Sequence, residues 1–389
     1  MIRKHALLSA SGAKRWLACP PSARLEDTME EQTSSYADEG GFAHRIAELL
    51  LRKELNFINP VKFANTLDTL TKDQYWSAEL LEYMEGFAAA VMERVNEAYK
   101  RSKDAFVLLE QQLDFSEWVP EGFGTGDVVI ISDGILEVID LKYGKGVPVE
   151  AEGNPQLLLY GLGAYGLYSP LFDIKSVRVT IAQPRLDSLT SGEMLAEDLL
   201  EWGSNYVRPR AQLAIEGKGE YCIGDHCQFC RAKALCRARA AYNLELAQYD
   251  FQQPATLEDG EIGDILARAD RLKDWVTDIT EYAYQQAMSG KKYDGWKLVE
   301  GRSNRKYSDE GAVVEALKAA GYDEAILYER VLLGLTKMET LIGKKRLEEY
   351  AGSLIIKPPG KPALVPESDK RPELRTIDNA INDFKNEGE

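Results

Sequence analysis

The sequence predicts an α/β protein in which helices and strands alternate over the first 250 residues and a mainly helical part follows. Apolar residues recur at helical spacing in two early segments, and three later segments have the short apolar runs typical of strands. In chain order, the predicted elements are helices at 40–55 and 76–102, strands at 105–115, 126–132 and 135–143, a helix at 154–168 and a strand at 174–184.

Local signals set the limits of these elements. Ser132-Asp133-Gly134 is a tight-turn sequence between two strand-like segments, so residues 126–143 are expected to form a β-hairpin. The strand at 174–184 alternates in polarity and ends at Pro184. The segment 154–168 is predicted to be helical despite its glycines.

Length and composition limit the class of protein. A chain of 389 residues with 44% hydrophobic residues is long enough for two or three domains. It has no apolar run long enough for a membrane span, and "ALLSA" near the start is shorter than a signal peptide requires, so a cytoplasmic protein is expected. A net charge of −16 argues against loose binding to nucleic acid or acidic lipid, although it allows a local basic groove.

Composition also divides the chain. Residues 1–250 are expected to form the main domain, and charged helical patterns over 251–356 predict an accessory domain. Residues 357–389 begin with a Pro-rich stretch of mixed charge, which predicts a linker or extended tail. There is no internal repeat.

Charged residues stand at the end of an apolar strand in "GILEVIDLKYGKG", residues 134–146. The hairpin brings Asp140 near Asp127, and two such carboxylates repel unless a cation neutralises them. Hard oxygen ligands suit Mg²⁺ or Mn²⁺. Lys142 projects to the same face as Asp140, where its ammonium could orient or deprotonate a water, or stabilise charge on a phosphate. The alternative is a surface Asp–Lys pair, which is common at strand ends.

Two residue pairs at helical spacing accompany this strand. His44 could bind the metal with Glu48 as support, because the two lie four residues apart on one helix face. Gln156 and Tyr160 share the same spacing on the later helix. They could contact a DNA backbone or brace the metal ligands, and each pair is also common on ordinary helices.

Together, "GGFAHRIAE", "GTGDVVII", "LEVIDLKYG" and "QLLLY" resemble, in this order, the motifs of the PD-(D/E)XK nuclease superfamily, in particular its RecB-like exonuclease branch. The resemblance covers roughly residues 11–240 and implies a restriction-endonuclease-like core, a mixed central sheet flanked by helices. It also implies that water attacks a phosphodiester with the help of a metal. The implied metal ligands are His44, Asp127, Asp140 and the main-chain carbonyl of Leu141, and the implied catalytic residues are Asp127, Asp140, Lys142, Gln156 and Tyr160.

Three of the five cysteines lie within "CQFCRAKALC", and a fourth ligand could come from Cys19 or Cys222. One upstream cysteine with a later C-x₂-C-x₅-C resembles the iron–sulfur staple of AddB-type and CRISPR-adaptation nucleases, which implies a [4Fe–4S] cluster. The implied ligands are Cys19, Cys227, Cys230 and Cys236, with Cys222 spare and His226 incidental. Zinc at the same thiolates, or no metal, remains an alternative.

Residues 291–307 interleave basic and aromatic side chains, which would suit DNA but is also found in ordinary loops. The C-terminal part resembles an uncharacterised family of phage and prophage genomes, which implies a role in recombination beside a single-strand annealing protein. The expected function is therefore a metal-dependent DNA exonuclease. The alternatives are a DNA-binding scaffold that retains the nuclease fold, or an endonuclease of the same fold.

Overall fold

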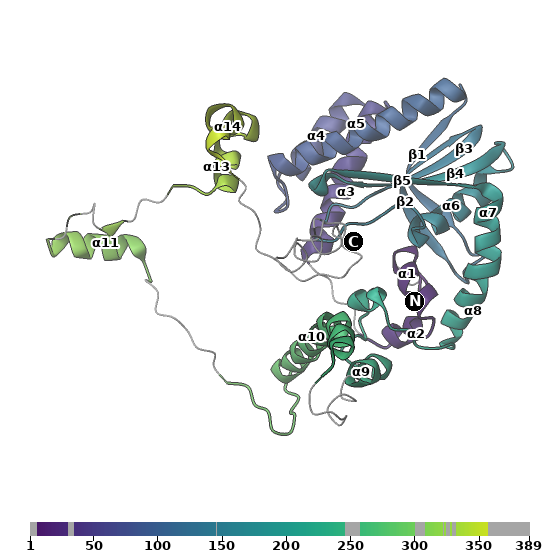
Figure 1. The fold of residues 1–389 in the computed structure, drawn as a ribbon. Coiled ribbons are helices and arrows are strands. Elements are labelled where there is room, and N and C mark those ends of the chain that lie inside the picture. The colour runs from purple at the N-terminus through teal and green to yellow at the C-terminus, as the bar shows by residue number, and fades with distance from the viewer. Residues whose placement is uncertain are drawn as a thin grey trace, which may run out of the picture. The chain divides into compact units, whose positions relative to one another are not determined.

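The computed structural model describes residues 6–29, 35–144, 146–245, 257–299, 308–321, 323, 327–328 and 332–356. The chain divides into two compact units, Met1–Gln285 and Gln286–Glu389. The first unit contains a five-stranded mixed sheet with helices on both faces, which confirms the expected α/β class (Figure 1).

The strands of the sheet are β1 (Phe106–Asp114), β2 (Phe123–Ser132), β3 (Gly134–Leu141), β4 (Ile174–Gln183) and β5 (Ser188–Leu195). The helices of the first unit are α1 (Ala13–Ala18), α2 (Ser22–Asp27), α3 (Ser35–Glu54), α4 (Pro60–Leu70), α5 (Ala78–Arg101), α6 (Pro155–Tyr168), α7 (Ala196–Trp202), α8 (Arg208–Glu216), α9 (Arg237–Leu244) and most of α10 (Asp259–Met288). All seven elements expected within residues 40–184 are present. The elements that were not predicted are α4 within that range and α1, α2, β5, α7, α8 and α9 outside it.

The strands lie in the order β1-β2-β3-β4-β5, and only the β3–β4 pair is parallel. The expected hairpin is confirmed, because β2 and β3 are antiparallel neighbours that meet at Ser132 and Gly134. The parallel pair needs a crossover connection, and α6 provides it. Consequently, the carboxyl ends of β3 and β4 lie at the same edge of the sheet.

Two apolar clusters cover the two faces of the sheet. On one face, α3 and α5 pack through residues such as Phe42, Ile46 and Met84 against Val128 and Ile139. On the other face, α6, α1 and α8 pack against the alternate strand residues. Burying these side chains stabilises the fold by about 25 cal/mol per Å² of apolar surface removed from water.

The first unit ends at Gln285 and includes most of α10, which ion pairs join to the segment before it. Asp278 on α10 lies 2.7 Å from the Lys233 ammonium and also pairs with Arg239, and Arg271 pairs with Asp225 at 3.0 Å. The second unit contains α11 (Glu310–Ala319), α13 (Leu335–Ile342) and α14 (Lys344–Ala351), in agreement with a mainly helical C-terminal part.

The tail expected at 357–389 lies outside the described residues. In the described part of the chain, no helix is both long enough and apolar enough to cross a bilayer.

Candidate metal centre and cysteine pocket

Three carboxylates form a row across neighbouring strands. The β1–β2 register places Glu110 opposite Asp127. Asp140 lies one step beyond the last β2–β3 pair, Val128 and Ile139, and therefore stands opposite Asp127 from the other side. Neighbouring strands are about 4.8 Å apart, so the three acidic side chains share one small region at the end of the sheet.

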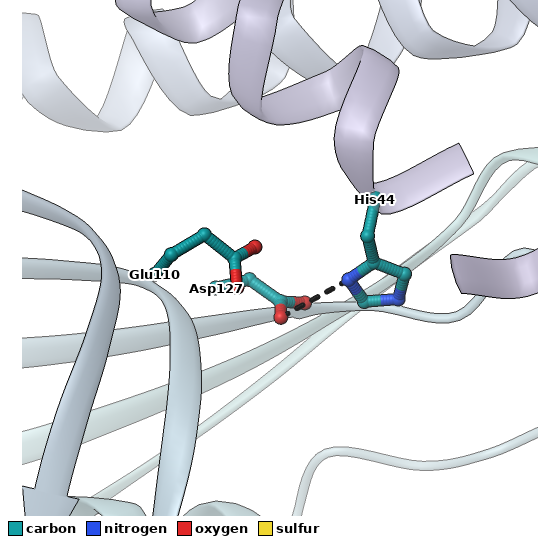
Figure 2. Close-up of side chains that lie close together, drawn as sticks. All are labelled: His44, Glu110 and Asp127. Carbon is teal, nitrogen blue, oxygen red and sulfur yellow. Dashed lines mark hydrogen bonds and ion pairs between the residues drawn. The ribbon is translucent and has the colours of Figure 1, made fainter. Parts of the chain in front are cut away.

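Helix α3 adds an imidazole to this row. His44 Nδ1 lies 3.1 Å from Asp127 Oδ1, while Asp127 Oδ2 accepts a hydrogen bond of 2.7 Å from the Leu141 amide. Figure 2 shows the His44 ring reaching down from its helix toward Asp127, with the Glu110 carboxylate beside it. One ligand atom from each of His44, Glu110 and Asp127 lies within 4.8 Å of the other two.

On the other side of Asp127, the buried Asp140 forms an ion pair with the partly exposed Lys142. Asp140 is only 3% exposed, and its Oδ2 lies 2.6 Å from Lys142 Nζ. Gln156 on α6 lies between the two, since its Nε2 donates to Asp140 Oδ1 and its Oε1 accepts from Lys142 Nζ, both at 3.1 Å. The Gln156 amide also reaches the Tyr160 hydroxyl at 3.3 Å. Gln156 and Tyr160 on α6 therefore lie where they can hold Asp140 and Lys142 in place.

A close approach between α6 and β2 holds this arrangement together. The Tyr160 ring packs directly over Gly124, where a Cβ atom would lie 2.6 Å from a ring carbon. Only glycine leaves that space, because Tyr160 is itself buried and its ring cannot swing away. Gly124 therefore permits the helix that carries Gln156 to sit against the strand.

The chain contains a second Asp-x-Lys sequence that illustrates the alternative reading of such motifs. Asp173 and Lys175 pair at 3.3 Å at the start of β4, but both side chains are more than 70% exposed. An exposed pair of this kind contributes little to stability. Asp140 and Lys142 have the same spacing in sequence but are enclosed by the sheet and α6, so they are not a surface pair.

The enclosed charges shift each other's pKa values. Burial, together with the charge of Asp127, raises the pKa of Glu110 to about 7. Burial also raises the pKa of Asp140 to about 6, although Lys142 opposes that shift. Burial alone would lower the pKa of His44, but its hydrogen bond to Asp127 and the surrounding carboxylates outweigh burial and raise it. The row of acids therefore carries unfavourable negative charge that a cation would relieve.

Replacing Glu110 by Gln should stabilise the metal-free protein at pH 8. The folded-state pKa of Glu110 lies above its unfolded value near 4.5, so the folded form binds more protons between pH 4.5 and 7 and the wild type loses stability as the pH rises through that window. The glutamine has no such dependence. In EDTA, the melting temperature of Glu110→Gln relative to wild type should rise by a few degrees from pH 5 to pH 8. A constant difference would show that Glu110 carries no unfavourable charge.

The structure brings most of the expected site residues together. His44, Asp127, Asp140, Lys142, Gln156 and Tyr160 all lie in this region. One detail differs from expectation, because Glu48 accepts a hydrogen bond from Arg52 at 2.7 Å instead of supporting His44. The Leu141 amide, on the expected carbonyl ligand's residue, donates a hydrogen bond to Asp127. Glu110 was missed, because one acid within a strand-like segment gives no signal in the sequence.

The five cysteines meet at a second place in the same unit. Cys19 at the end of α1 and the later cysteines line one partly open pocket with ≈ 340 Å³ of empty space. The lining residues include Cys19, Cys222, Cys227, Cys230, Cys236 and His226. Cys222, which was expected to be spare, thus reaches the same pocket, and its carbonyl oxygen lies 3.0 Å from His226 Nε2.

Polar contacts bind the two segments that form this pocket. Glu26 on α2 is 3% exposed, pairs with Arg15 at 2.7 Å and accepts a hydrogen bond of 2.6 Å from the Arg231 amide. Arg15 also donates to the Phe229 carbonyl at 3.2 Å. Burial, with the charge of Glu26, raises the pKa of the Cys230 thiol to about 12, so this thiol is protonated unless a metal displaces its proton.

The basic and aromatic segment expected at 291–307 is described only as far as Val299. There it forms a loop in which Lys291 lies 5.3 Å above the Tyr293 ring and Trp296 is 83% exposed. Residues 300–307 lie outside the described part of the chain.

A comparison with solved structures finds a similarity to one described as "Crystal structure of SSO0001", at 13% identity. The match covers 58% of this chain and 96% of the other, with a TM-score of 0.21, which does not establish a common fold. The family model described as "Protein of unknown function (DUF2800)" matches residues 5–372, nearly the whole chain. The chain therefore belongs to the DUF2800 family.

Proposed function

We propose that the protein is a metal-dependent deoxyribonuclease with a restriction-endonuclease-like core, acting as an exonuclease on DNA. The observation that carries this proposal is the enclosed Asp140–Lys142 pair beside His44 and Asp127. Four elements, α3, β2, β3 and the chain just after β3, supply these side chains, and α6 supplies the bracing Gln156. Such charges are costly to bury and are typical of functional sites.

The donor set fits a hard divalent cation. One imidazole nitrogen and several carboxylate oxygens converge, which suits Mg²⁺ or Mn²⁺. The nuclease resemblance implies that His44, Asp127, Asp140 and the Leu141 carbonyl would hold the ion. When bound, the ion supplies charge neutralisation and activation of water for attack on a phosphodiester.

The side chains around this centre would each perform a distinct task. Lys142 presents its ammonium where it can orient the attacking water and stabilise negative charge on the phosphate. Gln156 keeps Lys142 and Asp140 in one geometry through its two amide contacts, and Tyr160 fixes Gln156 in turn. The Leu141 amide holds Asp127 in place, so the acid is pre-organised before substrate arrives.

The cysteine pocket would hold a [4Fe–4S] cluster through Cys19, Cys227, Cys230 and Cys236. Four thiolates can bind a structural zinc ion as well as a [4Fe–4S] cluster, so the preference for the cluster comes from the resemblance of the cysteine spacing. The role of the cluster would be structural, since it ties α1 to a segment about 200 residues later.

A place in phage recombination, beside a single-strand annealing protein, rests on the resemblance of the C-terminal part alone. The net charge of −16 requires that any DNA contact be local. The exposed Trp296 and the lysines near it are candidates for such a contact.

Digestion of end-labelled DNA tests the proposed activity. Linear duplex and single-stranded DNA should be degraded from their ends in Mg²⁺ or Mn²⁺ and remain intact in EDTA. Closed circular duplex should survive, whereas its cleavage would identify an endonuclease. If cluster-containing protein binds DNA and cuts none of these substrates, it is a scaffold and the nuclease proposal is wrong.

A further inference from the structure

Four charged side chains lie at the metal centre: Glu110, Asp127, Asp140 and Lys142. They form two sets that differ in whether each charge has a partner of opposite sign. Lys142 neutralises Asp140 at 2.6 Å, and Gln156 holds the pair together. Glu110 and Asp127 have no such partner, because no lysine or arginine in the described part of the chain forms an ion pair with either of them. The printed polar contacts of these two carboxylates are the His44 imidazole and, for Asp127, the Leu141 amide, so neither has a cationic lysine or arginine partner.

The spacing of the ligand atoms separates the same two sets. Among the described residues, one group of three possible metal ligands (histidine, cysteine or acidic side chains) has its ligand atoms within 4.8 Å of each other. That group is His44, Glu110 and Asp127. Asp140 is not part of that group. The three side chains of the group come from β1, β2 and α3 (Figure 2). A cation bound to them would leave the Asp140–Lys142 pair intact.

The balance of charge also favours a cation between Glu110 and Asp127. A divalent cation between Glu110 and Asp127 neutralises both carboxylates, while Asp140 is already neutralised by Lys142. An ion that used Asp140 instead would compete with an ammonium for the same buried oxygen and leave Glu110 uncompensated. A cation at Glu110 and Asp127 therefore leaves less unpaired charge at the centre than a cation at Asp140 would.

We infer that Glu110 is a metal ligand, and that Glu110 rather than Asp140 completes the resting ion site with His44 and Asp127. This inference concerns the metal centre of the proposed nuclease and rests on that proposal for its biological meaning. Asp140 then serves in the free protein to hold Lys142. Glu110 comes from β1, which carries none of the residues that the sequence motifs include.

Titration with Mn²⁺ in the absence of DNA, followed calorimetrically or by the electron paramagnetic resonance of free Mn²⁺, tests the assignment. Wild type should bind one ion. Glu110→Gln should weaken binding by roughly 100-fold or more, as should Asp127→Asn. Asp140→Asn should weaken binding by much less than Glu110→Gln, because Asp140 pairs with Lys142 and does not contact the resting ion. Glu110→Asp should recover part of the lost affinity.

Glu85→Gln is the matched control, since it removes one exposed carboxylate from α5 and should bind Mn²⁺ like wild type. Circular dichroism confirms that each variant is folded. Unchanged affinity in Glu110→Gln, or a loss in Asp140→Asn equal to that in Glu110→Gln, would overturn the assignment. Activity separates this result from the nuclease proposal. Wild type that binds Mn²⁺ through Glu110 but cuts no DNA contradicts only the proposed function, and active protein with Glu110-independent binding contradicts only the inference.

Discussion

Asp140→Asn and Lys142→Met are each expected to abolish metal-dependent cleavage of linear DNA while leaving the protein folded. Lys142 supplies the one ammonium at the buried centre of the described structure, and Asp140 with Gln156 holds it there. Loss of a group that stabilises developing charge in an enclosed site costs roughly 10³-fold in rate. Initial rates on end-labelled duplex in Mg²⁺, with circular dichroism spectra of each variant, measure the effect.

The exposed Asp-x-Lys sequence at the start of β4 offers the control. Asp173→Asn and Lys175→Met make the same chemical changes at the same spacing, but in side chains that are more than 70% exposed. Their cleavage rates should match wild type, because a solvated pair contributes little. Full activity in both Asp140→Asn and Lys142→Met would show that the centre lies elsewhere.

Protein purified without oxygen should be brown and should contain about four iron atoms per chain, and Cys19→Ser should remove the colour. Cys19 joins α1 to the pocket that the later cysteines line, so a cluster there closes a loop of about 200 residues. By analogy with a disulfide that closes such a loop, its loss should cost about 5 kcal/mol of unfolding free energy. Iron analysis, the visible spectrum and urea unfolding measure these effects.

Cys222→Ser distinguishes the four assigned ligands from the fifth cysteine of the pocket. This variant should keep its iron and its stability, since four thiolates complete the cluster. If Cys222→Ser loses iron and Cys19→Ser does not, the ligand assignment is wrong. Colourless protein with stoichiometric zinc would show that the pocket binds zinc instead.

The order of helices and strands was predictable because local patterns carry it. The apolar spacing of α3 and α5, the hairpin turn at Ser132 and Gly134, and Pro184 after β4 all act within a few residues. β5 was missed because it is an edge strand in which no residue is fully buried, so its sequence lacks the apolar run typical of a strand. Its assignment as a strand depends on pairing with β4, which is not a local property.

The residues of the candidate site also divide into those that the sequence predicts and those that only the structure identifies. Asp127, Asp140 and Lys142 were found because they interrupt or follow apolar strand segments, and such positions stand out in a sequence. Asp173 and Lys175 have the same spacing, and only burial distinguishes the two pairs. Glu110 has a backbone φ of 50°, rare for a residue within a strand, and that conformation also cannot be read from its neighbours.

The sequence by itself determined the α/β class, the hairpin and the acids and lysine at its ends, since hydrophobic periodicity and turn chemistry are local. Only the tertiary structure decided which charges are neighbours. Strand register places Glu110 beside Asp127, the packing of α3 brings His44 to them, and the docking of α6 encloses Asp140 and Lys142. Register and packing depend on contacts between residues far apart in the chain, and the electrostatics of the site follows from those contacts.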